Sequence, residues 1–546
     1  MKVLLLQPPV QDFYNTDIRL QPVGLAYLKA AAAKYLPKIQ IVIKDYHHGQ
    51  GRRTIPLPRE LAYLKDYYAK DDKSPFSTFH HFYHFGATFE EIAEDVAKEK
   101  PDLVGIASLF APYHREALRC AEVIKARWPV PVLLGGAHVS AMPEFMLGNP
   151  SVDFVIQGEG ERPFVEFLKV FPKKQKFKSI PNLGYKESGR LIFNPRKENF
   201  PIETLPFPDL SDLPRDHYTF EKKPLCFLIT SRGCPYRCAF CSVHKTFGRK
   251  CRRRSPENIL AEIRQRYAEG TRVFDFEDDN LTFDRKEILE LCEKLILAFP
   301  QKDLQLLAMN GICYWTLDRE ILELMRRAGF THLNLSLVST NTKLLKGVLR
   351  PNRLKKYREV VKDATQLGFK VVAYQILGLP GDTLPSMIQT LVFNAKLPVL
   401  LGASPFYLIP NSPIARHCPE PSEADIYKAR LTAMAIETRD FRREDLYTLL
   451  ITTRILNFLK GIPLNAPKVS LPKALAIAKK LDLRSALGAE ILRRLLKEKI
   501  LHAATSKGLE PLSRFRPELF FQLWRKLATI TTQQGNTLVL NPFKEA

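Results

Sequence analysis

Three cysteines lie within eight positions of this 546-residue chain, in the segment TSRGCPYRCAFCSV at residues 230–243. Cys234, Cys238 and Cys241 are separated by three and then two residues, so one short loop can bring three thiolates to one inorganic centre. Zinc sites usually have four closing ligands in two separated pairs, and no second pair follows here at that spacing. Three thiolates fit better a [4Fe-4S] cluster with one open iron, because cysteines in tight loops hold such clusters.

Other interpretations of the three cysteines stay open. His244 or Cys251 would each provide a fourth ligand close in the sequence, and three structural cysteines in a buried loop are a further alternative. The loop is polar and basic and directly follows an expected strand. This position favours a functional centre over a purely structural role.

The composition is that of an ordinary globular protein, with 45% hydrophobic and 26% charged residues. No stretch approaches the ~18 consecutive apolar residues of a membrane-spanning helix, so we expect no membrane span. The apolar run in MKVLLLQPPV is four residues long and is soon followed by Pro8 and Pro9, which does not fit an export signal. We therefore expect a cytoplasmic protein whose thiols stay reduced or bind metal.

The net charge of +24 is high, but Lys and Arg are spread over all segments instead of forming blocks. Residues 421–546 are the most basic part, with 22 Lys and Arg against 12 Asp and Glu. This distribution argues against a nucleic-acid partner. It favours a solvated basic surface, or one that attracts an acidic protein or a membrane face.

Apolar runs alternate with helical patterns over the first 170 residues, as in a doubly wound, Rossmann-like α/β domain. The expected strands are residues 2–6, 39–45, 102–108, 131–136 and 153–158. The expected helices between them are residues 24–36, 88–100 and 114–128. Ligands of such sheets lie beyond the carboxyl ends of the strands. Glycines in those loops can let backbone approach a ligand, or simply form tight turns.

Residues 171–220 are rich in Lys and Pro and are expected to form a crossover between domains. Six strand–helix units then follow within residues 221–420, which predicts a partial (β/α)6 TIM-like barrel with its chemistry at the carboxyl ends of the strands. Its expected strands are residues 225–231, 272–278, 304–310, 332–339, 370–378 and 402–409. Apolar spacing after residue 421 predicts an α-helical C-terminal domain, residues 421–546.

CxxxCxxC after the first strand of a partial barrel resembles the radical S-adenosylmethionine superfamily, and Phe240 before the last cysteine matches its usual pattern. The resemblance implies that the open iron binds the amino and carboxylate groups of S-adenosylmethionine. One electron then cleaves this molecule to a 5′-deoxyadenosyl radical, so a donor such as flavodoxin or ferredoxin is an implied partner. Three residues of the loop become the implied cluster ligands: Cys234, Cys238 and Cys241.

The same resemblance implies S-adenosylmethionine contacts on later strands. FDFEDDNLTF resembles the segment that meets the methionine amino group, and carboxylates are apt there because an ammonium group must be held. Many relatives have Glu where this chain has Val338, so the ribose contact is left open. The expected contacts, besides Phe240, are Glu277, Asp278, Asp279, Asn280, Asn310, Ser336, Ile376 and Gly378.

The first domain resembles the cobalamin-binding subclass, through QPVGLAYLKAA, PDLVGIASL, LLGGAHVSAMP and VDFVIQGEGE, and the resemblance covers about residues 1–420. A corrinoid needs a long slot at strand ends, with glycine backbone against its nucleotide tail. His47 or His48 is an alternative axial ligand or rim contact, but we expect cobalamin bound without a protein ligand. The expected contacts are Pro9, Asp45, Ser108, Leu109, Gly135, Gly136, His138, Gly158 and Glu159.

The resemblance implies a cobalamin-dependent radical S-adenosylmethionine enzyme that acts on an unactivated carbon of a small molecule or peptide. Methyl transfer through methylcobalamin is the leading expectation, and radical oxidation or ring formation without net methylation is the alternative. Methylthiolation would need a second cluster, and the six remaining cysteines are isolated. A non-catalytic corrinoid-binding or nucleic-acid-binding protein is the alternative outside enzymes, and the intact cysteine triad argues against it.

Overall fold

The computed structural model describes residues 1–16, 20–173, 176–417 and 419–540. They form two compact units, each built from separated segments. The first unit contains Met1–Pro56, Phe82–Asn280 and Ile409–Ala429, and the second contains Leu57–His81, Leu281–Leu408 and Arg430–Ala546. Residues 57–81, from the predicted first domain, therefore group with the second unit. No helix in these ranges combines the length and apolarity that crossing a membrane requires.

A seven-stranded sheet of order β10-β9-β8-β7-β6-β1-β3 organises the first unit. All five strands predicted for the first domain are confirmed, and they are parallel: β1 (Lys2–Gln7), β3 (Gln40–Asp45), β6 (Leu103–Ala107), β7 (Val132–Gly135) and β8 (Phe154–Ile156). The expected crossover instead adds an antiparallel hairpin, β9 (Leu183–Glu187) and β10 (Arg190–Phe193). Its turn residues Ser188 and Gly189 both have positive φ, as hairpin turns require.

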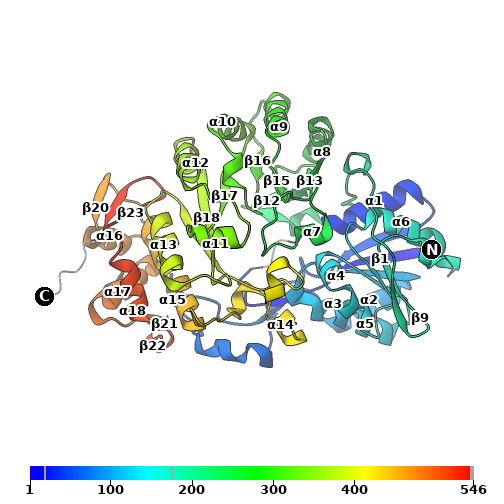
Figure 1. Cartoon of the computed structure of the whole chain (residues 1–546), viewed down its shortest axis with the longest axis horizontal. Helices are drawn as coiled ribbons and strands as arrows, with labels where there is room; N and C mark the ends of the chain where they lie inside the picture. The colour runs from blue at the N-terminus through cyan, green and yellow to red at the C-terminus, as the bar shows by residue number, and fades with distance from the viewer. Residues whose placement is uncertain (17–19, 174–175, 418, 541–546) are drawn as a thin grey trace. The chain divides into compact units, whose positions relative to one another are not determined.

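Helices cover both faces of this sheet, which confirms the doubly wound architecture (Figure 1). Alternation along β1 sends Val3 and Leu5 into the core beneath α1 (Val23–Tyr35) and α6 (Glu161–Val170). Leu4 and Leu6 pack on the opposite side against α2 (Phe89–Glu99) and α3 (His114–Arg127). Two short helices, α4 (Ala137–Ala141) and α5 (Pro143–Gly148), follow β7. A small antiparallel sheet joins β2 (Val10–Asp12), β5 (Tyr83–Phe85) and β4 (Arg52–Thr54).

The first unit also contains the start of the barrel region. Strands β12 (Lys223–Leu228) and β15 (Val273–Phe276) are parallel, and β11 (Thr219–Phe220) pairs with β12. Between them lie β13 (Ser231–Arg232), α7 (Val243–Thr246), β14 (Arg252–Arg253) and α8 (Pro256–Ala268). The pair Ser255–Pro256 is typical of a helix start, and helix α8 begins there: Ser255 Oγ accepts from Asn258 N at 3.2 Å and Pro256 occupies the first position. Helix α14 (Glu423–Tyr427) lies in the last segment of this unit.

The second unit holds the remaining predicted barrel strands, β16 (Gln305–Leu307), β17 (His332–Val338), β18 (Lys370–Leu377) and β19 (Leu400–Pro405). Strands β17, β18 and β19 form a parallel sheet. Amphipathic helices alternate with them: α9 (Arg285–Ala298), α10 (Arg319–Ala328), α11 (Thr342–Gly347), α12 (Leu354–Gln366) and α13 (Leu384–Ala395). All six predicted strand–helix repeats are therefore present.

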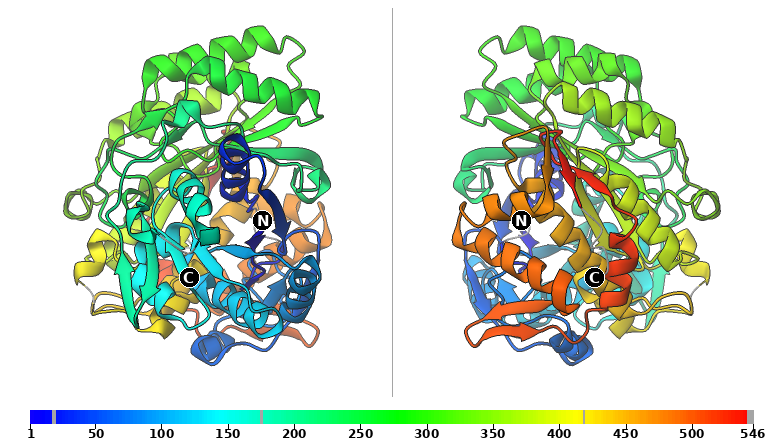
Figure 2. Two further views of the ribbon diagram at one scale, coloured as in Figure 1. Left: turned by 90° about the vertical axis from the view of Figure 1, so that its right-hand side faces the viewer. Right: turned by 90° about the vertical axis from the view of Figure 1, so that its left-hand side faces the viewer.

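The C-terminal region is mainly helical, as predicted, with α15 (Arg443–Gly461), α16 (Leu471–Ala478), α17 (Leu483–Glu498) and α18 (Pro517–Trp524). Short strands, orange to red in the right-hand view of Figure 2, accompany them: β20 (Lys468–Ser470), β21 (His502–Thr505), β22 (Gly508–Pro511), β23 (Thr529–Thr531) and β24 (Thr537–Val539). Each has only three or four residues, which is too short for a strand period to appear in the sequence.

Candidate active site

The three cysteines lie in the loop between β13 and α7, just beyond the end of β12. Cys238 is only 8% exposed, and Cys234 and Cys241 are partly buried. The loop curls tightly, because Cys241 N donates to the carbonyl of Cys238 at 3.1 Å. Gly233 has φ +86°, and a Cβ there would lie 2.4 Å from Lys250 O, so only glycine fits before the first cysteine.

The thiols are close enough to affect one another. Burial raises the pKa of Cys241 to about 11, with smaller upward contributions from Cys238, Asp279 and Cys234. Burial likewise raises the pKa of Cys234. Nowhere in the described ranges do three His, Cys, Asp or Glu side chains converge as a single metal ion would require. A cubane cluster does not need that convergence, since each cysteine binds a different iron, and the loop therefore fits a [4Fe-4S] group.

The acidic segment after β15 supports the cysteine loop from one side. Asp278 is buried, and it accepts from Thr230 Oγ1 at 2.7 Å and from the hydroxyl of Ser231. Asp279 accepts from Gly233 N at 2.8 Å, and burial raises its pKa to about 6. These two carboxylates hold the backbone that leads into Cys234.

Asn280 has the free acceptor of this segment. Its side chain is buried, Nδ2 lies 4.0 Å from Cys234 Sγ, and Oδ1 has no hydrogen-bond partner within the described residues. A buried amide oxygen without a partner is costly unless a ligand supplies the donor. The ammonium group of S-adenosylmethionine is such a donor. Glu277, the first residue of the segment, donates its backbone N to Leu228 O at 2.8 Å.

A buried cluster of charges lies directly before the first cysteine. Arg232 donates to Glu159 Oε1 at 2.8 Å and to Glu161 Oε1 at 2.6 Å, and the rings of Tyr27 and Phe247 flank its guanidinium group. Arg252, the partner of Arg232 across the β13–β14 ladder, pairs with Glu159 Oε2 at 2.7 Å. We call the group of Glu159, Glu161, Arg232 and Arg252 the charge clamp.

The charge clamp engages both carboxylate oxygens of Glu159, which pair with arginines of β13 and β14, the strands on either side of the cysteine loop. The cobalamin contact expected for Glu159 stays a prediction. The adjacent Gly158 has φ +73° and donates its N to Ser140 Oγ at 2.8 Å. The loop after β8 therefore contacts α4 on one side and, on the other, strands β13 and β14, which flank the cysteine loop.

The loops after β6 and β7 form a compact backbone arrangement. Gly136 has φ +126°, and a Cβ there would lie 2.4 Å from Ser108 O, so the two loops approach as only glycine permits. His138 N donates to the same Ser108 carbonyl at 3.1 Å. At Gly135 an added Cβ would meet nothing within 4 Å, which leaves open space above the backbone.

Buried polar atoms at the carboxyl ends of β1, β6 and β7 lack partners. Within the described residues, no hydrogen bond reaches Gln7 Oε1, Ser108 Oγ, or either ring nitrogen of His138. His138 is 2% exposed, and burial lowers its pKa to about 3, so its ring is neutral. Leu109 and Phe110, which follow Ser108 in the chain, are 37% and 46% exposed. Exposed apolar side chains beside unsatisfied polar atoms fit a macrocycle fringed with amides, such as cobalamin.

Asp45 and Pro9, two other residues expected to contact cobalamin, lie in the loops that follow β3 and β1. Asp45 accepts from His47 N at 2.9 Å and from His48 Nδ1 at 2.7 Å, and the hydroxyl of Tyr218 bonds to the same carboxylate. Asp45 therefore organises the loop after β3. Pro9 is buried in the turn between β1 and β2.

Phe240, an expected S-adenosylmethionine contact, is partly buried in the cysteine loop of the first unit, and the remaining expected contacts lie in the second unit. Ser336 in β17 and Ile376 in β18 lie on neighbouring parallel strands, and Asn310 is exposed in the turn after β16. Gly378 has φ +79°, and a Cβ there would come within 3.0 Å of Leu446 and Phe441. Val338 stands at a β-bulge with φ +71°, which is strained for a β-branched residue.

Sequence reasoning missed several residues that organise the site. Glu161 and Arg232 were both visible, in GEGE and before the first cysteine, but nothing in the sequence paired them across 71 positions. Asn334 was also missed: it is buried in β17, donates to Tyr374 Oη at 2.7 Å, and leaves Oδ1 without a partner within the described residues. The signal was the alternation HLNLSLV, which places Asn334 and Ser336 on one face of the strand.

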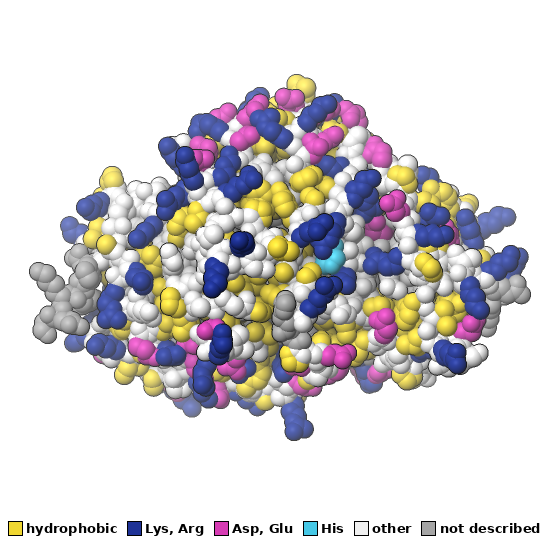
Figure 3. Space-filling view, in the orientation of Figure 1, with side chains coloured by type: hydrophobic (Ala, Val, Ile, Leu, Met, Phe, Trp, Pro, Cys, Tyr) yellow, Lys and Arg dark blue, Asp and Glu magenta, His cyan; other side chains and the backbone are white. Residues whose placement is uncertain are grey.

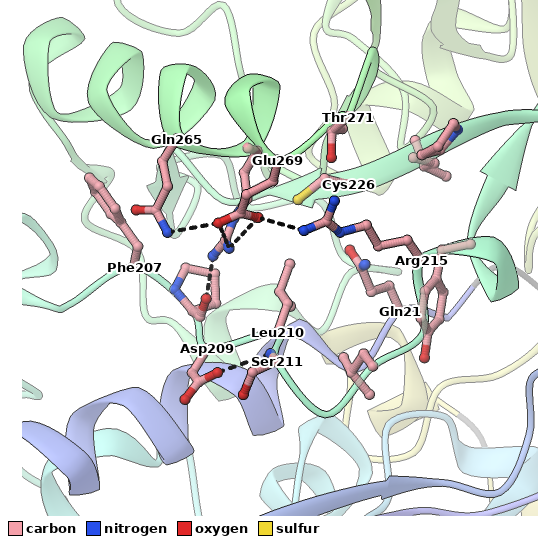
Figure 4. Close-up of a pocket in the computed structure, with 16 residues that line it drawn as sticks. Gln21, Phe207, Asp209, Leu210, Ser211, Arg215, Cys226, Gln265, Glu269 and Thr271 are labelled. Carbon is pink, nitrogen blue, oxygen red and sulfur yellow. Dashed lines mark hydrogen bonds and ion pairs between the residues drawn. The ribbon is translucent and has the colours of Figure 1, made fainter.

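A cavity of about 590 Å³ in the first unit, shown in Figure 4, has none of the three loop cysteines in its lining. It is lined by residues at the start of β12 and just before β15, at the amino ends of those strands. Glu269 is one of the lining residues, and its carboxylate accepts from Gln265 Nε2 and from Arg266 Nη1, each at 3.2 Å. Chemistry in barrels of this kind occurs at the carboxyl ends, so this cavity is outside the candidate site.

Two family models match the chain in the regions just described. The model of the radical SAM superfamily matches residues 228–393, and the model of the B12 binding domain matches residues 63–168. An uncharacterised methyltransferase of Pyrococcus horikoshii is 28% identical over 405 residues, which cover 73% of this chain and 79% of the relative. Cytidylyl-2-hydroxyethylphosphonate methyltransferase of Streptomyces wedmorensis is 25% identical over 424 residues, covering 69% and 73%.

Solved structures share the fold. The cobalamin-dependent S-adenosylmethionine radical enzyme OxsB, solved with aqua-cobalamin, superposes with a TM-score of 0.62 at 15% identity, covering 96% of this chain and 78% of OxsB. Both family models and this shared fold agree with the cysteine loop and the glycine-lined loops of the first unit. The chain therefore belongs to the cobalamin-binding radical S-adenosylmethionine superfamily, whose enzymes use a [4Fe-4S] cluster, S-adenosylmethionine and cobalamin.

Proposed function

We propose that this chain methylates an unactivated carbon of a small molecule or peptide. Cys234, Cys238 and Cys241 would hold the cluster, and the loops around Ser108, Gly136 and His138 would hold cobalamin. When bound, these groups would supply a 5′-deoxyadenosyl radical that takes hydrogen from the substrate and a methyl group for the carbon that lost it. The matched methyltransferases support methyl transfer as the outcome.

One observation carries this proposal: the charge clamp joins the two cofactor loops. Glu159 follows Gly158 in the loop after β8, on the side of the sheet where cobalamin would bind. It pairs with Arg232, two residues before Cys234. Two reactive groups must act on one substrate carbon, so their loops need a fixed relation. Buried, multiply bonded ion pairs supply that rigidity better than exposed contacts.

The other residues of the site have distinct proposed roles. Asp278 and Asp279 hold the backbone before Cys234, and Asn280 Oδ1 would accept from the ammonium group of S-adenosylmethionine. His138 is neutral and would exchange hydrogen bonds with the amides at the edge of the corrinoid. Leu109 would exclude water from one face of the slot.

The test is anaerobic reconstitution with iron, sulfide and hydroxocobalamin. We expect visible spectra of both groups and release of 5′-deoxyadenosine from S-adenosylmethionine after reduction. S-adenosylmethionine labelled on its methyl group should pass the label to the substrate once candidates are screened. Cobalamin binding without a reducible cluster would overturn the proposal. Product without the label would instead assign oxidation or ring formation.

A cytoplasmic location is part of this proposal. The eight cysteines within the described residues are all free thiols, as a reducing compartment maintains them. Cell fractionation under anaerobic conditions would test it.

A further inference from the structure

The cysteine loop has an unusual distribution of charge. Residues 232–254 contain eight Arg and Lys and no Asp or Glu. Three of these side chains turn inward to carboxylates of the first unit: Arg232, Arg252 and Arg254. Four others are exposed or partly exposed: Arg237, Lys245, Arg249 and Lys250. The eighth, Arg253, is partly buried and hydrogen-bonds Cys251. Carboxylates balance the three inward charges, whereas the four outward ones have no such partner among the described residues.

A fifth cation joins this outer face from a distant part of the sequence. Ile414 N donates to the carbonyl of Ala239, between Cys238 and Cys241, at 2.8 Å. This bond brings the segment containing exposed Arg416 against the cysteine loop. We call Arg237, Lys245, Arg249, Lys250 and Arg416 the cationic rim. In Figure 3 dark-blue side chains gather where Figure 1 places α7.

The cationic rim lacks neutralising partners. Over the described part of the chain, none of its five side chains forms an ion pair with a carboxylate. Arg249 Nη1 makes a weak bond, at 3.3 Å, to the carbonyl of Tyr236, which lies inside the cysteine loop. Unbalanced charge on one surface creates a field that attracts anionic partners and speeds their association.

The rim also lies where an electron must enter. Arg237 is the neighbour of Cys238, and Lys245 lies in α7, four residues after Cys241. Cys238 is only 8% exposed, so a protein donor would have to approach the cluster over the side chains that surround the loop. Electron transfer slows steeply with distance, which makes this the favourable surface for a donor.

We propose that the cationic rim is the docking surface for an acidic one-electron carrier protein that reduces the cluster. The carrier loses one electron, the cluster gains it, and no bond forms or breaks in that step. A small, charge-steered interface is typical of electron-transfer complexes, which need rapid release as well as rapid encounter. This inference rests on the proposed function, because it requires a redox-active cluster in the loop.

The experiment compares two triple variants with equal loss of charge. The rim variant is Arg249→Gln, Lys250→Gln and Arg416→Gln. The control, on exposed lysines of the second unit, is Lys480→Gln, Lys497→Gln and Lys507→Gln. Reconstituted full-length proteins are mixed with reduced flavodoxin, an acidic flavoprotein, and loss of the cluster absorbance is followed by stopped flow. Dithionite serves as a small reductant that needs no docking surface.

We expect the rim variant to lose about tenfold in its second-order rate constant with flavodoxin at low salt. The difference should shrink at high salt, because salt screens exposed charges. The control variant should match the native protein, and all three should react equally with dithionite at high salt, where the charge of this anionic reductant is screened.

Equal rates with flavodoxin in all three proteins would overturn the inference. So would equal losses with flavodoxin and dithionite, which would mean that the rim acts on the cluster itself. Loss of duplex-DNA binding in the rim variant, with an unchanged flavodoxin rate, would assign the surface to nucleic acid instead. If dithionite fails to reduce the native protein, the proposed function fails, which the dithionite arm reports separately.

Discussion

Arg232 Nη2 donates to Glu161 Oε1 at 2.6 Å, and the two side chains are only 4% and 5% exposed. Burying a charge is expensive, and a close ion pair with further hydrogen bonds offsets much of that cost. Asn199 Nδ2 donates to Glu161 Oε2 at 2.5 Å, and Arg232 Nη1 donates to Glu159 Oε1 at 2.8 Å, while Arg232 Nε has no hydrogen-bond partner within the described residues. Arg232, two residues before Cys234, is therefore fixed by carboxylates that lie 71 and 73 positions earlier in the chain.

Removing one charge of this pair should be costly. We expect Glu161→Gln to lower the free energy of unfolding by about 3–5 kcal/mol, because Arg232 would lose its buried counter-charge. Urea unfolding followed by circular dichroism measures the change. Glu166→Gln in the same helix is the matched control, since its pair with Arg162 is partly exposed and is worth less than about 1 kcal/mol. Equal effects of the two changes would contradict the assigned role.

Asp382 should make stability depend on pH. Its side chain is buried, and burial raises its pKa to about 6. Because the folded-state pKa is above the unfolded value, the group's contribution is fully present below about pH 4 and is lost as pH rises through 6. We therefore expect Asp382→Asn to be more stable than the native protein at pH 7 by about 1–3 kcal/mol. Unfolding curves at pH 4 to 7 should show this difference vanish at the acid end; a constant difference would refute it.

Replacing a cysteine of the loop and replacing an isolated cysteine should have different effects on the cluster. We expect Cys238→Ala to lose bound iron, the visible cluster spectrum and 5′-deoxyadenosine formation, while it still binds hydroxocobalamin. Cys226→Ala, at a buried and isolated cysteine in β12, is the control and should keep all three properties. Iron and sulfide assays with cobalamin titration make the comparison. Retention of a full cluster in Cys238→Ala would point to another ligand, such as Cys251.

Gly136, in the loop after β7 where cobalamin would bind, should be irreplaceable. Alanine at Gly136 would place its Cβ 2.4 Å from Ser108 O at φ +126°, a conformation costing about 1–3 kcal/mol. We expect Gly136→Ala to weaken cobalamin binding about tenfold, which corresponds to 1.4 kcal/mol. Spectroscopic titration with hydroxocobalamin measures this. Gly148→Ala in α5, where a Cβ meets nothing within 4 Å, should bind like the native protein.

Much of the fold follows from the sequence because local patterns determine it. The apolar strands β1, β3, β6, β7 and β8 and the capped helix α8 appear where apolar runs and Ser255–Pro256 predict them. The hairpin β9–β10 was missed because Lys-rich and Pro-rich flanks hide two short strands. Residues 57–81 group with the second unit through tertiary contacts, such as Asp72 Oδ1 accepting from Ala504 N at 2.9 Å, which no local pattern reveals.

The candidate site divides in the same way. The cysteine spacing and the Gly-Gly pair can be recognised in the sequence, because their chemistry depends on residues close together in the chain. Glu159 and Asp45 look like ligand-binding residues in the sequence, yet their carboxylates bond Arg232 and His48. The Glu159–Arg232 pair joins segments 73 positions apart, and Asp45 also accepts from Tyr218, 173 positions away, so residue type alone cannot predict these pairings.

The charge clamp limits how this protein can be divided. A fragment beginning at residue 221 would keep Arg232 and Arg252 but lack Glu159 and Glu161, leaving two cations without their counter-charges beside the cysteines. We therefore expect the barrel segment not to be stable by itself, although part of it matches a family model of its own. Transplanting it onto another corrinoid domain would require the recipient to bring two carboxylates in the same register, after a glycine that can adopt the φ of Gly158.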